Sequence, residues 1–141
     1  MDLLSLLPHQ PPMRLLDDIV ELQPGTLAVA RRLMRENDFF FQGHFPGDPV
    51  VPAIILVELV AQTGGLAAGA PRAGEPNGPI ALRVVALGPF KFPAAARPGD
   101  MLEVRARVVG EIGSLYKVEG EVAASGRAVA TGSVTLARID A

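Results

Sequence analysis

The alternation of hydrophobic and polar residues divides the chain into two short strands, one apolar segment and a C-terminal run of strands. Residues 14–22 (RLLDDIVEL) and 26–34 (TLAVARRLM) flank the turn dipeptide Pro24-Gly25, which predicts an antiparallel hairpin. Further strands are expected over residues 80–87, 101–109, 114–123 and 127–138, with breaks of hairpin length between the last three. The pattern therefore predicts a largely antiparallel sheet.

One segment has neither strand nor amphipathic character. Residues 50–70 (VVPAIILVELVAQTGGLAAGA) are long and apolar enough to be scored as a membrane-spanning helix. Glu58 and Gln62 near its middle argue against a span, because ionisable and polar groups are costly there. The sequence favours a buried helix from about Pro52 to Leu66, which a curved sheet must wrap. This predicts an α+β fold with one domain over residues 1–141.

Residues 39–52 (FFFQGHFPGDPVVP), which precede the expected helix, are too rich in Gly and Pro for regular structure. This loop is nevertheless apolar, whereas surface loops are usually polar. We therefore expect it to lie against the core or against a partner chain.

Composition excludes several classes of function. The chain has 141 residues, 49% hydrophobic and 20% charged, with a net charge of −2, which argues against disorder and gives no global attraction to nucleic acid or an anionic membrane. It has no cysteine and two histidines, which leaves little for a metal site, and no phosphate-loop pattern, so no cofactor is expected. The N-terminus lacks a signal-peptide pattern, and a cytoplasmic location is expected.

Glu58 is the residue that most suggests chemistry. Its helical neighbours from Ile54 to Ala61 are apolar on every side, so an unpaired carboxyl there is favoured in its protonated, proton-donating form. Gln62, one turn further on, can hydrogen-bond that carboxyl. The alternative is a surface-facing Glu on an amphipathic helix, but the segment has no polar stripe.

His44 lies between Gly43 and Phe45, and a loop histidine is often only a structural hydrogen-bonding group. Here the glycine allows the backbone to approach a ligand, and the aromatic residues favour a neutral imidazole that can accept a proton. The helix start at Pro52 and Ala53 offers free N–H groups that could hold a thioester carbonyl. A base, an acid and such a carbonyl site suffice for elimination of water.

Other polar residues are given structural roles. His9 is expected to cap or pack near the N-terminal turn, and Tyr116 to lie in the core or an interface. Asp17 and Asp18 are neighbours in a strand and should point to opposite faces, so they are not a catalytic pair.

Residues 39–62 (FFFQGHFPGDPVVPAIILVELVAQ) closely resemble the signature of the hot-dog-fold 3-hydroxyacyl-acyl-carrier-protein dehydratases of the FabZ type, in the FabA/FabZ-like family. Residues 7–25 resemble the family's N-terminal Leu-Pro-His segment, and 98–104 (PGDMLEV) a later strand. The resemblance implies an antiparallel sheet wrapped around one long central helix. It also implies dehydration of 3-hydroxyacyl thioesters to trans-2-enoyl thioesters in fatty acid or related acyl-chain biosynthesis.

By this resemblance His44 is the general base and Glu58 the general acid, with Gln62 supporting the acid and the N–H of Ala53 holding the carbonyl. It further implies a homodimer, or a trimer of dimers, in which each site combines the His of one subunit with the acid of the other. The implied substrate carrier is acyl carrier protein.

The sequence departs from the family in two places. Ala53 stands where the family usually has Gly, and residues 90–100, which precede a strand, are longer and less basic than in relatives. Two alternatives stay open at this point: a hot-dog acyl thioesterase, and a non-catalytic acyl-thioester binding protein or assembly partner.

Overall fold

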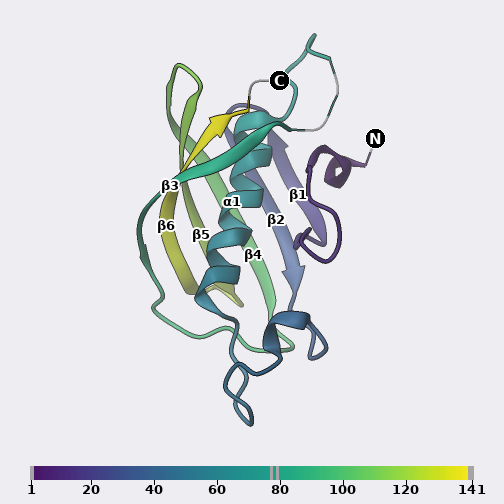
Figure 1. Cartoon of the computed structure of the whole chain (residues 1–141), viewed down its shortest axis with the longest axis vertical. Helices are drawn as coiled ribbons and strands as arrows, with labels where there is room; N and C mark the ends of the chain where they lie inside the picture. Colours follow the sequence, from purple (N-terminus) through teal and green to yellow (C-terminus); the bar gives the residue numbers. More distant parts are fainter. Residues whose placement is uncertain (1, 77, 79, 140–141) are drawn as a thin grey trace.

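The computed structural model describes residues 2–76, 78 and 80–139, and shows one long helix packed against a six-stranded antiparallel sheet (Figure 1). The helix is α1 (Ala53–Gly69), and two short 3-10 helices cover Leu3–Leu6 and Phe39–Phe41. The strands are β1 (Asp18–Gln23), β2 (Leu27–Leu33), β3 (Leu82–Lys91), β4 (Met101–Ile112), β5 (Leu115–Ala124) and β6 (Arg127–Arg138). Their order in the sheet is β1-β2-β4-β5-β6-β3, and the predicted combination of one helix with an antiparallel sheet is confirmed.

The predicted N-terminal hairpin is present, but β1 starts at Asp18, four residues later than the pattern indicated. Leu15 and Leu16 are both buried, so the chain does not alternate there as a sheet strand does. The backbone N–H of Leu15 donates instead to the side chain of Gln62 on α1. The turn itself is as predicted, with Gly25 at φ +82°.

The helix continues to Gly69, beyond the predicted end at Leu66. A side chain at Gly64 would place a Cβ atom 2.9 Å from Val118 on β5. The glycine thus allows α1 to lie close to the sheet. Strand β3 starts two residues later and ends four residues later than predicted, and β4 ends three residues later.

The core lies between the sheet and the sheet-facing side of α1. On β4, within the strand expected over residues 101–109, the alternating residues Leu102, Val104 and Ala106 are fully buried. On β5, Gly120 leaves room for Val60 of the helix, whose Cγ1 would lie 2.4 Å from an added Cβ. The close approach of helix and sheet therefore fixes which side of α1 is left open.

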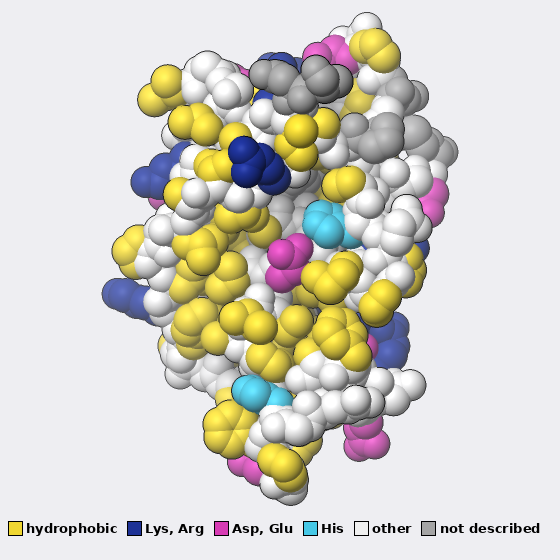
Figure 2. Space-filling view, in the orientation of Figure 1, with side chains coloured by type: hydrophobic (Ala, Val, Ile, Leu, Met, Phe, Trp, Pro, Cys, Tyr) yellow, Lys and Arg dark blue, Asp and Glu magenta, His cyan; other side chains and the backbone are white. Residues whose placement is uncertain are grey.

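The open side is apolar. Ile54 on the first turn of α1 is 76% exposed, and Val84, Val85 and Leu87 on β3 are 40%, 43% and 58% exposed. Since β3 is the last strand in the sheet, one of its edges has no strand partner among the described residues. Figure 2 shows hydrophobic side chains gathered over this face of the molecule. No helix within the described ranges is long and apolar enough to cross a membrane.

Candidate active site

Glu58 lies half-buried on the open side of α1, where Gln62 contacts its carboxylate. Gln62 Nε2 donates to Glu58 Oε2 at 2.8 Å and to the carbonyl of Met13 at 2.7 Å, and Gln62 Oε1 accepts the N–H of Leu15 at 3.0 Å. Gln62 is 1% exposed, so these bonds satisfy a buried amide on both of its polar atoms. The N-terminal segment therefore fixes Gln62, and Gln62 in turn contacts Glu58.

A cavity of about 270 Å³ opens beside Glu58. Its polar lining residues are Glu58, His9, Gln62 and Arg83. The remaining wall has no polar side chains and comes mainly from the N-terminal segment, α1, β3 and β6. Its residues are Leu7, Pro8, Ala61, Gly65, Ile80, Leu82, Val84 and Leu136. Such a cavity, apolar with few convergent polar groups, suits an acyl chain beside one reactive carboxyl.

His9 is a neighbour of Glu58 that the sequence interpretation missed. Its Nε2 lies 3.6 Å from Glu58 Oε2, and its Nδ1 is buried with no hydrogen-bond partner among the described residues. The expected role in capping or packing did not place it at the cavity. No sequence spacing relates positions 9 and 58, because only the fold of the N-terminal segment over α1 brings them together.

His44 lies in the loop between the second 3-10 helix and α1, and is held within that loop. Its Nδ1 is 2.9 Å from the carbonyl oxygen of Val50, and its backbone N–H donates to Phe41 at 3.3 Å. The ring meets that of Phe45 edge to face at 4.8 Å. Because Val50 offers only an acceptor, Nδ1 carries the proton in this contact, and Nε2 of a neutral ring keeps a free lone pair.

The backbone around His44 has unusual dihedral angles. Gly43 has φ +73°, and Phe45, which is 61% exposed, has φ +54°, a region that non-glycine residues rarely adopt. Strain of this kind costs on the order of 1–3 kcal/mol and is found most often at functional sites.

The first turn of α1 presents free backbone donors. Pro52 precedes the helix, and the N–H groups of Ala53 and Ile54 have no acceptor among the described residues. Both residues are exposed. These donors, with the partial positive charge of a helix N-terminus, suit an oxygen that gains negative charge.

In one chain the two halves of this site are separate. No hydrogen bond or ion pair between His44 and Glu58 occurs in the part of the chain that the structure describes, and His44 is not among the residues that line the Glu58 cavity. His9 is the histidine that lies beside Glu58 in a single chain.

Comparison with known proteins identifies the family of the chain. A family model described as a FabA-like domain matches residues 7–133. The chain belongs to the FabA-like family. Curated relatives named 3-hydroxyacyl-[acyl-carrier-protein] dehydratase FabZ include one from Campylobacter hominis, 35% identical over 85% of this chain and 83% of the relative, and one from Herpetosiphon aurantiacus, 34% identical over 99% and 96%. The resemblance to the FabZ-type branch of the FabA-like family is thus confirmed.

Solved structures show the same fold at low sequence identity. The dehydratase heterocomplex ApeI:P from Xenorhabdus doucetiae matches with a TM-score of 0.78 and 15% identity, over 99% of this chain and 92% of that chain. The E. coli PaaI protein matches with a TM-score of 0.65 and 17% identity, over 86% and 82%. The hot-dog arrangement expected from the FabA-like signature is confirmed.

Proposed function

We propose that this chain is a hydro-lyase that removes water from 3-hydroxyacyl thioesters carried by acyl carrier protein, giving trans-2-enoyl thioesters for fatty acid or related acyl-chain biosynthesis. Membership of the FabA-like family and the names of the FabZ relatives support the reaction. They do not favour the thioesterase or the non-catalytic alternative. The observation that carries the mechanism is that His44 and Glu58 have hydrogen-bond partners suited to opposite roles.

His44 is the proposed general base. With its Nδ1 proton donated to Val50, its Nε2 lone pair can take the α-proton of the thioester. The electron pair of the broken C–H bond forms the new double bond. The N–H of Ala53, which has no acceptor of its own, would hold the carbonyl oxygen as charge develops on it. Gly43 and Phe45, which flank His44 with positive φ angles, and Pro52, which precedes α1, are proposed to contact the substrate.

Glu58 is the proposed general acid. Gln62 donates to Oε2, which leaves a proton on the other carboxyl oxygen free to reach the substrate's 3-hydroxyl group. As the C–O bond breaks, this proton leaves with the hydroxyl as water. The apolar wall of the adjoining cavity suits the acyl chain.

We infer that the working unit is a homodimer, in which His44 of one subunit faces Glu58 of the other. Three features support this: the two groups do not meet in one chain, β3 has an open edge, and that face is apolar. An open, apolar edge strand ordinarily needs a cover. A trimer of dimers and a cytoplasmic location remain predictions.

The reaction is tested by following enoyl thioester formation from a 3-hydroxyacyl thioester on acyl carrier protein and on coenzyme A. Enoyl product without free thiol supports the proposal. Free thiol without enoyl product would identify a thioesterase, and tight binding with no product would identify a binding protein.

The shared site is tested by complementation. His44→Ala and Glu58→Gln subunits, each inactive alone, are co-expressed with different tags and purified together. Random pairing should restore about one quarter of wild-type activity, because half of the dimers then contain one intact site of two. If both residues acted within one chain, mixing would restore nothing.

A further inference from the structure

Arg32 on β2 is a charged residue that the core almost completely encloses, at 7% exposure. Its guanidinium forms an ion pair with Asp38, whose side chain is 12% exposed, and lies 5.7 Å from the centre of the Phe40 ring. Its Nη1 donates to the carbonyl of Leu15 at 3.4 Å. Buried ion pairs are costly to form, so their presence calls for a role beyond stability.

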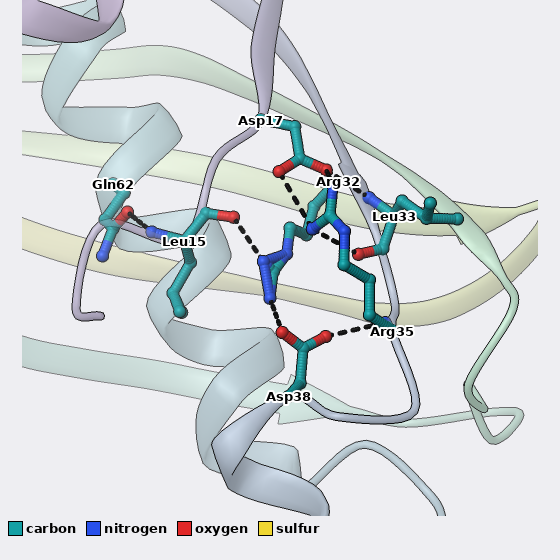
Figure 3. Close-up of polar contacts among 7 residues, drawn as sticks. All are labelled: Leu15, Asp17, Arg32, Leu33, Arg35, Asp38 and Gln62. Atoms are coloured by element: carbon teal, nitrogen blue, oxygen red, sulfur yellow. Dashed lines mark hydrogen bonds and ion pairs between the residues drawn. The ribbon is translucent and has the colours of Figure 1, made fainter. Parts of the chain in front are cut away.

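One chain of hydrogen bonds connects Arg32 to Glu58. The carbonyl of Leu15 accepts from Arg32, and the N–H of the same residue donates to Gln62 at 3.0 Å. Gln62 in turn donates to Glu58 at 2.8 Å. Figure 3 shows Leu15 between Gln62 on one side and Arg32 on the other. Leu15 thus connects Arg32 to the amide that contacts the acid.

A second chain of contacts connects Arg32 to the loop of His44. Asp38, paired with Arg32, also accepts the N–H of Arg35 at 2.7 Å, so its carboxylate is fixed from two sides (Figure 3). The carbonyl of Asp38 accepts the N–H of Phe41 at 3.1 Å, and the carbonyl of Phe41 accepts the N–H of His44 at 3.3 Å. Asp38 therefore starts the backbone turns that carry His44.

Nearby charges reinforce this end of β2 at the surface. Arg35 contacts Asp17 at 3.1 Å, and that carboxylate raises the pKa of Arg35 above its ordinary value through a hydrogen bond and charge attraction. Asp17 also accepts the N–H of Leu33 at 2.7 Å. These contacts are exposed or half-exposed, in contrast to the enclosed pair of Arg32 and Asp38.

We propose that Arg32 is a positioning residue for dehydration, which fixes the orientation of Glu58 through Leu15 and Gln62 and the place of His44 through Asp38. This inference rests on the proposed function, since it assigns Arg32 to the acid and the base named there. Catalysis by two groups on one substrate is sensitive to small displacements, and a shift of about 1 Å can cost roughly 10²-fold in rate. Binding of the acyl chain in an apolar cavity does not depend on such placement.

The test compares Arg32→Met with Arg31→Met, its neighbour on the same strand. Arg31 points to the opposite face, is about half exposed, and pairs with Asp18 at 3.1 Å. Both changes remove one arginine, so net charge is matched. For folded Arg32→Met we expect kcat to fall about tenfold or more with KM changed less than threefold, since only positioning is lost. Arg31→Met should keep both constants.

Arg32→Lys gives a second measurement. Lysine keeps the charge beside Asp38 but replaces the planar fork with a single nitrogen, so it should restore the thermal midpoint more fully than it restores kcat. We expect kcat about threefold below wild type at an unchanged midpoint. If Arg32→Met does not fold, the kcat of Arg32→Lys alone tests the inference.

A folded Arg32→Met with kcat within twofold of wild type would overturn the inference, as would Arg32→Lys with full kcat. A parallel fall of activity and folded fraction, with normal kcat per folded molecule, would show a merely structural role and overturn it too. Failure of the proposed function looks different, because the wild-type chain would then form no enoyl thioester.

Discussion

The helix that carries Glu58 and the loop that carries His44 support their residues in opposite ways. Glu58 depends on distant chain, because Gln62 bonds to backbone 47 and 49 residues away. His44 depends on its own loop, where the carbonyl that holds its ring is six residues away. One half of the candidate site thus forms only when the whole domain folds, whereas the other is largely prescribed by local backbone geometry.

This contrast predicts which substitutions should alter stability and which should alter activity. Changes around Glu58 should alter global stability together with activity, since the same bonds serve both. Changes around His44 should alter activity with a smaller effect on stability than changes around Glu58. Four predictions test this contrast, and they run from the largest expected effect to the smallest.

Loss of either reacting group should have the largest effect on kcat, and the effect should be of similar size for His44 and Glu58. His44→Ala and Glu58→Gln should each lower kcat about 10²- to 10⁴-fold, the usual contribution of a positioned acid or base. Enoyl formation measures this, and Glu103→Gln on the exposed side of β4 is the control. Near-normal activity in either variant would remove that residue from the mechanism.

Gln62→Leu should show the long-range dependence most clearly. It would leave the buried N–H of Leu15 and the part-buried carbonyl of Met13 without their partner, lowering the free energy of unfolding by about 3 kcal/mol. His44→Ala should cost less than about 1 kcal/mol, as expected for a loop side chain. Urea unfolding of both variants gives the comparison, and equal losses would contradict it.

Gly43→Ala should show the local dependence. At φ +73° an added methyl meets no atom, so the cost is backbone strain of about 1–2 kcal/mol, enough to displace His44 and lower kcat severalfold. Gly47→Ala, at φ +91° with equally open space, is the matched control. Gly47→Ala should lower the free energy of unfolding by a similar amount but lower kcat less than Gly43→Ala does. Equal kcat in the two variants would mean that Gly43 does not set the place of His44.

His9→Phe should have the smallest effect. The contact with Glu58 is 3.6 Å long, and both side chains are about one-third exposed, so its loss should lower kcat only about two- to fivefold. His9→Gln, which keeps a polar group, should lie closer to wild type. A loss as large as that of Glu58→Gln would make His9 itself a reacting group.

Much of the fold could be predicted from the sequence, because its signals are local. The alternation of Leu102, Val104 and Ala106 indicated the buried face of β4, and all three are fully buried. The late start of β1 at Asp18 and the continuation of α1 past Leu66 to Gly69 could not be predicted. Both depend on which distant side chain fills the space beside the backbone.

The site divides in the same manner. The spacing of Glu58 and Gln62 on one helix predicted their contact, and the contact is present at 2.8 Å. The approach of His9 and the enclosure of Arg32 were not foreseen, since both come from segments folded over α1 from elsewhere in the chain. The available signal for Arg32 was the adjacent pair Arg31-Arg32 inside an expected strand, because neighbouring strand residues point to opposite faces.

The open edge of β3 has a consequence for how the protein behaves when diluted. With the proposed homodimer, two copies of this ten-residue strand join into one sheet, and separating them also separates each histidine from its carboxyl. Activity per molecule would then depend on protein concentration, falling in very dilute solution and returning as subunits find each other again.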